Sequence, residues 1–140
     1  MSTAMPRILC VDDCALNLTL FETVLALCGY KVVLTESGKE ALEIINREKI
    51  DLVLLDINMP GLSGFEVCKK IKDDERHKNI PVILVTGETS KEDHLKGFEA
   101  GAEDFIEKPF EPTDLLTRVN MLLNRKNPLD NLTTIKSVPI

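Results

Sequence analysis

The sequence contains no tryptophan, and aromatic residues make up only 4% of its 140 residues. It has no apolar run near the roughly 18 residues that a membrane-spanning helix needs. Its first residues also lack the basic segment and apolar stretch of a secretory signal. We therefore expect a cytoplasmic protein without a membrane anchor. The length and a hydrophobic content of 44% fit a single globular domain.

Two further absences concern charge and cysteine. The net charge is −6 and no basic stripe is present, so we expect no direct contact with nucleic acid. The four cysteines (Cys10, Cys14, Cys28 and Cys68) form no C-x-x-C pair, which favours small buried side chains in a reducing compartment over disulfides or a zinc site. The role of Cys14 stays open, because it directly follows two aspartates.

Short apolar runs alternate five times with longer amphipathic stretches, which is typical of a parallel sheet with crossover helices. We expect strands at 7–11, 31–35, 51–55, 81–86 and 104–107. We expect helices at 15–28, 38–48, 64–74, 91–101 and 112–125. This pattern predicts a three-layer α/β domain over residues 1–125, with 126–140 as a tail or linker. The strand order is either 2-1-3-4-5, as in flavodoxin-like folds, or that of a truncated dinucleotide-binding fold.

Helix boundaries carry their own signals. Three starts have the capping-box pattern of a serine followed three residues later by an acid: Ser37/Glu40, Ser63/Glu66 and Ser90/Asp93. Gly29 and Gly101 suit helix ends, and Pro112 suits a first helical turn.

Polar side chains follow four of the expected strands. They are Asp12 and Asp13, Asp56, Thr86, and Lys108. Because the carboxyl ends of parallel strands meet at one edge of a sheet, we expect these side chains to converge. Three carboxylates in one pocket favour a hard divalent cation such as Mg²⁺. A carboxylate nucleophile, a metal and an ammonium group together suit phosphoryl transfer, and Asp56 is the central candidate nucleophile.

The ordered set of motifs resembles the receiver domain of two-component response regulators. The resemblance runs from about residue 7 to residue 125. Its motifs are Val11-Asp12-Asp13, Asp56-Ile57-Asn58-Met59-Pro60 with Gly64, Val85-Thr86-Gly87, Gly101-Ala102-Glu103-Asp104-Phe105 and Lys108-Pro109-Phe110. The resemblance implies the flavodoxin-like order 2-1-3-4-5, with a likeness to the chemotaxis regulators.

The resemblance also implies a site and its cofactor. Asp56 would take a phosphoryl group from a sensor histidine kinase, a histidine phosphotransfer protein or a small phosphodonor. Asp13, Asp56 and the backbone carbonyl of Asn58 would bind Mg²⁺ directly, with Asp12 acting through a metal-bound water. The protein would not be an enzyme acting on other molecules, although it would assist its own phosphorylation and dephosphorylation.

Further roles implied by the resemblance belong to the residues around the phosphoryl group. Lys108 would pair with the phosphoryl oxygens, and its bond to Pro109 would be cis. Thr86 would move toward the phosphoryl group, and Phe105 would turn inward into the space that Thr86 vacates. Phosphorylation would thereby change binding to a downstream effector that the sequence does not identify.

Other functions fit the residues less well. A phosphatase resembling the haloacid dehalogenases also uses an aspartyl nucleophile and Mg²⁺, but it needs a second aspartate two residues later as general acid, and that position is Asn58. A flavin carrier is disfavoured by the acidic turn at Asp12 and Asp13. No G-x-G-x-x-G loop supports dinucleotide binding.

Two surfaces are candidates for protein contacts. A phosphorylation-favoured homodimer through the fourth helix, fifth strand and fifth helix would use a set of charged residues that matches positions in related receivers. These are His94, Glu103, Asp104, Asp114, Arg118 and Arg125. The first helix has one apolar face with Leu16, Leu20, Val24 and Leu27, and a second with Leu18, Phe21, Leu25 and Cys28. Either both faces are packed, or part of the second meets a partner.

Overall fold

Five parallel strands form one sheet in the computed structural model, which describes residues 5–87 and 91–123. The strands are β1 (Arg7–Val11), β2 (Lys31–Thr35), β3 (Leu52–Asp56), β4 (Val82–Thr86) and β5 (Asp104–Glu107). Their order is β2-β1-β3-β4-β5. This confirms the flavodoxin-like order and excludes the dinucleotide-binding alternative.

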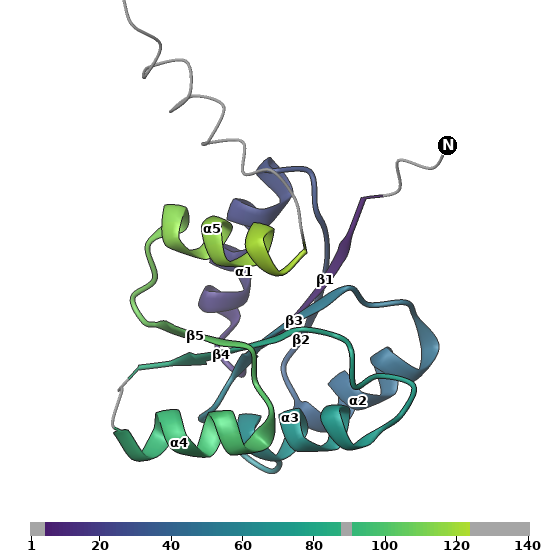
Figure 1. The fold of residues 1–140 in the computed structure, drawn as a ribbon. Coiled ribbons are helices and arrows are strands. Elements are labelled where there is room, and N and C mark those ends of the chain that lie inside the picture. Colours follow the sequence, from purple (N-terminus) through teal and green to yellow (C-terminus); the bar gives the residue numbers. More distant parts are fainter. Residues whose placement is uncertain (1–4, 88–90, 124–140) are drawn as a thin grey trace, which may run out of the picture.

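Helices cover both faces of the sheet (Figure 1). They are α1 (Ala15–Leu27), α2 (Gly38–Arg47), α3 (Gly64–Asp73), α4 (Lys91–Ala100) and α5 (Pro112–Leu122). Helices α1 and α5 pack on one face, and α2, α3 and α4 on the other. Side chains that alternate along each strand fill two hydrophobic clusters, one per face, so the central strands β3 and β4 are buried along their whole length.

Strand and helix bounds differ slightly from the predicted ones. The third strand is Leu52–Asp56, one residue later than expected, because Asp56 pairs with Val85 of β4. The fourth strand begins at Val82, since Pro81 has no N–H group and contributes only its carbonyl, which accepts a bond from Val53 N at 3.0 Å. Helices α1 to α4 each end one residue earlier than predicted, and α5 ends at Leu122.

The predicted caps are present in part. Ser63 and Glu66 form a complete capping box. At Ser37 the prediction is half wrong: the serine accepts a bond from Glu40 N, but the Glu40 carboxylate accepts from the Thr35 hydroxyl instead of reaching back to the cap. Ser90 lies outside the described residues. Gly29 and Gly101 both have positive φ, as expected at helix ends, and Pro112 begins α5.

Helix α1 buries only one of its two apolar faces. Leu18, Phe21 and Leu25 lie in the core between α1, α5 and the sheet, so the second face has no room for a partner. Leu16, Leu20 and Leu27 are exposed, which makes the prediction of two packed faces wrong as well. The exposed leucines are therefore the face of α1 that is available for contact.

All four cysteines are free thiols, but they are not uniformly buried. Cys10 and Cys68 are buried, Cys28 is partly buried, and Cys14 is exposed. Burial raises the pKa of the Cys10 thiol and raises that of Cys68 to about 12. Among the described residues, no helix is both long enough and apolar enough to cross a membrane.

Candidate functional site

The residues expected at the site converge at the carboxyl edge of the sheet. Asp12 and Asp13 follow β1, Asp56 ends β3, and Lys108 follows β5. One oxygen from each of the three carboxylates lies within 4.8 Å of the others. The strand order explains this, because β1 and β3 are neighbours and both end here. The three carboxylates are thus placed as metal ligands would be.

Asp12 is fully buried and has a partner on each oxygen. Oδ1 accepts a bond from Cys14 N at 2.9 Å. Oδ2 accepts from Asn17 Nδ2 at 3.2 Å and pairs with Lys108 Nζ at 3.0 Å. Asn17 was not predicted as a site residue, although its position in the first turn of the helix after Asp12 places it within reach. These bonds hold the Asp12 carboxylate in one orientation.

Asp56 is 3% exposed and is less fully paired than Asp12. Its Oδ1 accepts a bond from Asn58 N at 3.3 Å and lies 3.5 Å from Lys108 Nζ. Burial and the neighbouring Asp12 charge raise the pKa of the Asp56 carboxyl, against the opposing effect of Lys108. The site therefore holds excess negative charge, which a bound cation would relieve.

Lys108 faces both buried aspartates. Burial of its ammonium opposes the charged form, but hydrogen bonds and charge from Asp12 and Asp56 prevail and raise the pKa of Lys108. Its backbone N–H donates to the Thr86 carbonyl at 2.7 Å, which ties the end of β5 to β4. The bond from Lys108 to Pro109 is cis, as predicted.

Thr86 and Gly64 complete the surroundings of Asp56. Thr86 ends β4 and is buried. Gly64 begins α3, and a Cβ there would lie 2.4 Å from the Asp56 carbonyl oxygen, so only glycine allows α3 to start this close to the site. Asn58 is exposed, two residues after Asp56. The donor set of carboxylates and carbonyls fits Mg²⁺.

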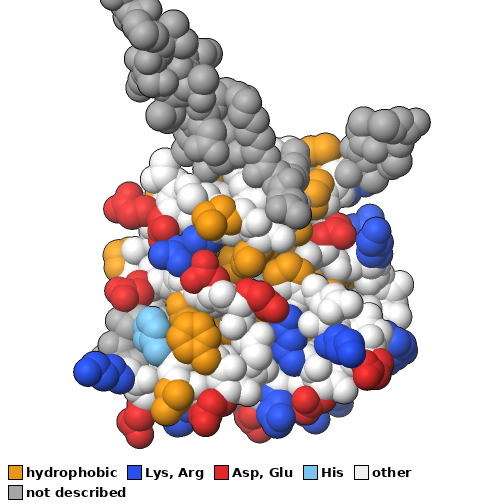
Figure 2. Space-filling model, in the orientation of Figure 1, with side chains coloured by type: hydrophobic (Ala, Val, Ile, Leu, Met, Phe, Trp, Pro, Cys, Tyr) orange, Lys and Arg blue, Asp and Glu red, His pale blue; other side chains and the backbone are white. Residues whose placement is uncertain are grey.

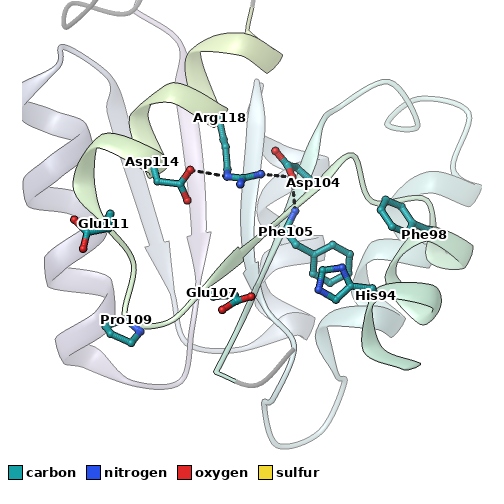
Figure 3. Close-up of a pocket in the computed structure, with 9 residues that line it drawn as sticks. All are labelled: His94, Phe98, Asp104, Phe105, Glu107, Pro109, Glu111, Asp114 and Arg118. Atoms are coloured by element: carbon teal, nitrogen blue, oxygen red, sulfur yellow. Dashed lines mark hydrogen bonds and ion pairs between the residues drawn. The ribbon is translucent and has the colours of Figure 1, made fainter. Parts of the chain in front are cut away.

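Phe105 lies inward, with 7% of its surface exposed. The His94 imidazole stacks on its ring with the centroids 4.5 Å apart, and the Phe98 ring contacts it edge-on at 5.7 Å (Figure 3). These side chains border a surface pocket of about 430 Å³ between α4, β5 and α5. On the face that carries these elements, hydrophobic and acidic side chains lie next to one another (Figure 2).

The charged residues expected at a dimer interface have partners within the chain. Arg118 lies between two carboxylates, with Nη1 2.7 Å from Asp104 Oδ1 and Nε 2.9 Å from Asp114 Oδ1 (Figure 3). Glu103 pairs with Lys72 Nζ at 2.7 Å and also accepts a bond from Val82 N. Arg125 lies outside the described residues. A dimer that used these charges would have to exchange bonds already formed in one chain.

The chain belongs to the family of response regulator receiver domains, which it matches over residues 8–120. It is 41% identical over 126 residues to the response regulator PleD of Caulobacter vibrioides, covering 90% of this chain and 28% of PleD. It is 37% identical over 124 residues to the phosphate regulon transcriptional regulatory protein PhoB of Pseudomonas aeruginosa, covering 89% of this chain and 54% of PhoB. The chain thus spans about a quarter to a half of these relatives.

Solved structures agree with the family and the fold. The chemotaxis protein CheY4 of Vibrio cholerae superposes with a TM-score of 0.82 at 33% identity, over 86% of this chain and all of CheY4. The receiver domain of the Pseudomonas aeruginosa sensor histidine kinase PA1611 has a TM-score of 0.80 at 29% identity, over 86% of this chain and 99% of that domain. That structure has a magnesium ion coordinated in its active-site cleft. The phosphatase alternative finds no support in these comparisons.

Proposed function

We propose that this chain is a phosphoacceptor whose Asp56 takes a phosphoryl group in a Mg²⁺-dependent reaction. The observation that carries the proposal is the cluster of Asp12, Asp13 and Asp56 with Lys108 beside it. An oxygen of Asp56 would attack the phosphorus of a phosphohistidine or acetyl phosphate. The bond from phosphorus to the donor atom would break, and the donor would leave without the phosphoryl group.

The surroundings of each carboxylate suggest how a cation would be held. Asp13 is exposed, Asp56 ends β3, and Asn58 lies on the loop after β3. The carboxylates of Asp13 and Asp56 and the carbonyl of Asn58 are the proposed direct ligands. The oxygens of Asp12 already accept bonds within the chain, which supports contact through water. When bound, Mg²⁺ would neutralise charge on the transferred group and on the aspartates.

Lys108 and Thr86 are the proposed partners of the phosphoryl oxygens. Lys108 Nζ is held 3.0 Å from Asp12 and 3.5 Å from Asp56, so it can pair with an anion on Asp56 while Asp12 keeps it in place. Thr86 ends the neighbouring strand and has a hydroxyl that can donate. These residues would assist phosphorylation and dephosphorylation of their own chain, not turnover of another substrate.

The proposed phosphodonor is a sensor histidine kinase or a histidine phosphotransfer protein. Leu16 and Leu20 of α1 are exposed and provide apolar surface on this helix. Leu20 also lines a small groove with Pro109 and Phe110, next to Lys108. A donor helix with apolar side chains would cover this surface while its histidine reaches Asp56.

Phosphorylation would change the face formed by α4, β5 and α5. In this proposal, Thr86 moves toward the phosphoryl group, and Phe105, whose ring already lies inward, moves further into the space that Thr86 vacates. This movement alters the pocket beside His94. A downstream effector or a second copy of the chain would then bind there. Residues 126–140 would be a tail or linker, and the four free thiols support a cytoplasmic setting.

Intact mass spectrometry tests the proposal. The chain is incubated with acetyl phosphate and Mg²⁺, alongside Asp56→Asn, a matched control Asp73→Asn on the exposed side of α3, and a chelator-treated sample. We expect one phosphoryl group on the wild type and on the control, and none on Asp56→Asn or with chelator. Phosphorylation of Asp56→Asn to the wild-type level would refute the assignment. Light scattering with beryllofluoride tests dimerisation, which an unchanged monomer mass would refute.

A further inference from the structure

Phe105 is enclosed by side chains of α4 and by the sheet. Its ring belongs to the hydrophobic cluster that contains Leu84 of the neighbouring strand. His94 stacks on it with an interplanar angle of 17°, and Phe98 meets it at 71°. The position of the ring therefore depends on how closely α4 approaches β5 (Figure 3).

Gly97 lies at the point of closest approach. It is three residues after His94 on α4, so both residues lie on the same side of the helix. A Cβ at Gly97 would lie 2.0 Å from Cζ and 2.7 Å from Cε2 of Phe105, and 3.0 Å from Cδ1 of Leu84. Separations this short are far inside van der Waals contact. No side chain at this position is compatible with the present place of the ring.

The backbone gives no other reason for glycine here. Gly97 lies inside a helix and is not among the residues with positive φ. Glycine is also a poorer helix former than alanine, so its presence in the middle of α4 disfavours the helix. The benefit of glycine at this position is the room that it leaves for the Phe105 ring.

We propose that Gly97 is the positioning residue for Phe105, forming the space between α4 and β5 in which the ring sits inward and so setting the shape of the pocket on this face. The proposal rests on the proposed function, in which Phe105 transmits phosphorylation of Asp56 to a partner. A methyl group at position 97 displaces the ring toward the surface pocket beside His94 and Phe98. The three atoms nearest that methyl group belong to Phe105 and Leu84, and none belongs to Asp12, Asp56 or Lys108.

Aromatic NMR with ¹³C-labelled phenylalanine tests the proposal in the full chain. Spectra of the wild type, Gly97→Ala and the matched control Lys96→Ala, an exposed neighbour on α4, are recorded with a soluble gadolinium chelate. A Phe105→Leu variant identifies the Phe105 signals among those of the five phenylalanines. In the wild type and the control, the chelate should broaden Phe98, which is 60% exposed, and leave Phe105 protected.

In Gly97→Ala we expect the Phe105 signals to broaden at least threefold more than in the wild type. The proposal would be overturned if the Phe105 signals of Gly97→Ala are protected from the chelate as well as those of the wild type. Intact mass after acetyl phosphate treatment is measured on the same samples. A wild type that takes no phosphoryl group would defeat the proposed function, whereas the ring position is measured without phosphorylation and is judged separately.

A second variant covers the case in which Gly97→Ala does not fold. In Gly97→Ala/Phe105→Ala the ring is gone, so the added methyl group keeps only its 3.0 Å contact with the end of the flexible Leu84 side chain. Alanine at this position then improves the helix. We expect the unfolding temperature of the double variant to exceed that of Phe105→Ala alone. A double variant that unfolds at or below the temperature of Phe105→Ala alone would overturn the proposal.

Discussion

Replacing Asp56 by asparagine should stabilise the metal-free chain at neutral pH. An oxygen of Asp12 lies within 4.8 Å of one of Asp56, which at an effective dielectric constant of about 20 corresponds to a repulsion of at least about 3.5 kcal/mol. The attraction between Asp56 and Lys108 Nζ at 3.5 Å is about 4.7 kcal/mol on the same scale. The difference favours the Asp56 carboxylate by at most about 1.2 kcal/mol, which is less than the cost of several kcal/mol for burying a charge, so the burial cost decides the sign.

The direction of the Asp56 pKa agrees, because it is raised by burial and by Asp12 despite Lys108. A carboxyl whose pKa is higher in the folded state contributes stability below its unfolded pKa of about 3.9 and loses it as the pH rises through the folded value. We therefore expect Asp56→Asn to match the wild type near pH 3.5. At pH 7 without metal it should be about 1–2 kcal/mol more stable, or roughly 4–8 °C in Tm.

Thermal unfolding in a chelator between pH 3.5 and pH 8 measures this difference. Adding millimolar Mg²⁺ should raise the wild-type Tm more than that of Asp56→Asn, because a ligand that binds only the folded state stabilises it and the variant has lost one ligand. Asp73→Asn, which changes an exposed carboxylate, should stay within about 0.5 kcal/mol of the wild type throughout. A wild type that is more stable than Asp56→Asn at pH 7 without metal would refute the reasoning.

Three other predictions concern packing, capping and thiol reactivity. Gly64→Ala should lower the free energy of unfolding in urea by about 2–3 kcal/mol, because the backbone atom that the added Cβ meets cannot give way. Gly87→Ala, with no described atom within 4 Å of its Cβ, should change this free energy by less than about 0.5 kcal/mol. Equal effects of the two substitutions would contradict this prediction. Ser63→Ala removes a capping box and should cost about 1 kcal/mol, so an unchanged urea midpoint would count against the cap. Iodoacetamide should label exposed Cys14 in the native protein and Cys10 only on unfolding. Peptide mass spectrometry measures the labelling of each cysteine. Equal labelling rates of Cys14 and Cys10 in the native protein would argue against burial of Cys10.

Much of the fold could be predicted from periodicity, but the strand order could not. Apolar runs mark which residues are buried, and the runs at 7–11, 31–35 and 104–107 coincide with β1, β2 and β5. Periodicity carries no information on which strands are neighbours, so it leaves two strand orders open. The motifs that resemble the receiver family favour one of them. The shift of β3 has the same origin, since the pairing of Asp56 with Val85 is a contact between distant segments.

The candidate site could also be predicted only in part. Asp12, Asp56 and Lys108 could be predicted because strand ends place them at one edge of the sheet. Side-chain partners depend on distances that sequence spacing does not give. Asn17 donates to Asp12, and Arg118 is bound within its own chain. Neither bond was predicted.

Strand β5 physically connects the proposed phosphorylation site with the face that we expect a partner to meet. Its side chains alternate, so Phe105 packs with the cluster under α4 and Ile106 with the cluster under α1 and α5. Just beyond the strand, Lys108 reaches the buried aspartates, and its N–H is bonded to the Thr86 carbonyl. Seven residues, 101–107, separate the end of α4 from Lys108, and four of them form β5. We therefore expect a displacement of Lys108 or Thr86 to move the Phe105 backbone as well. The space beside Gly97 then decides which side-chain positions Phe105 can take in response.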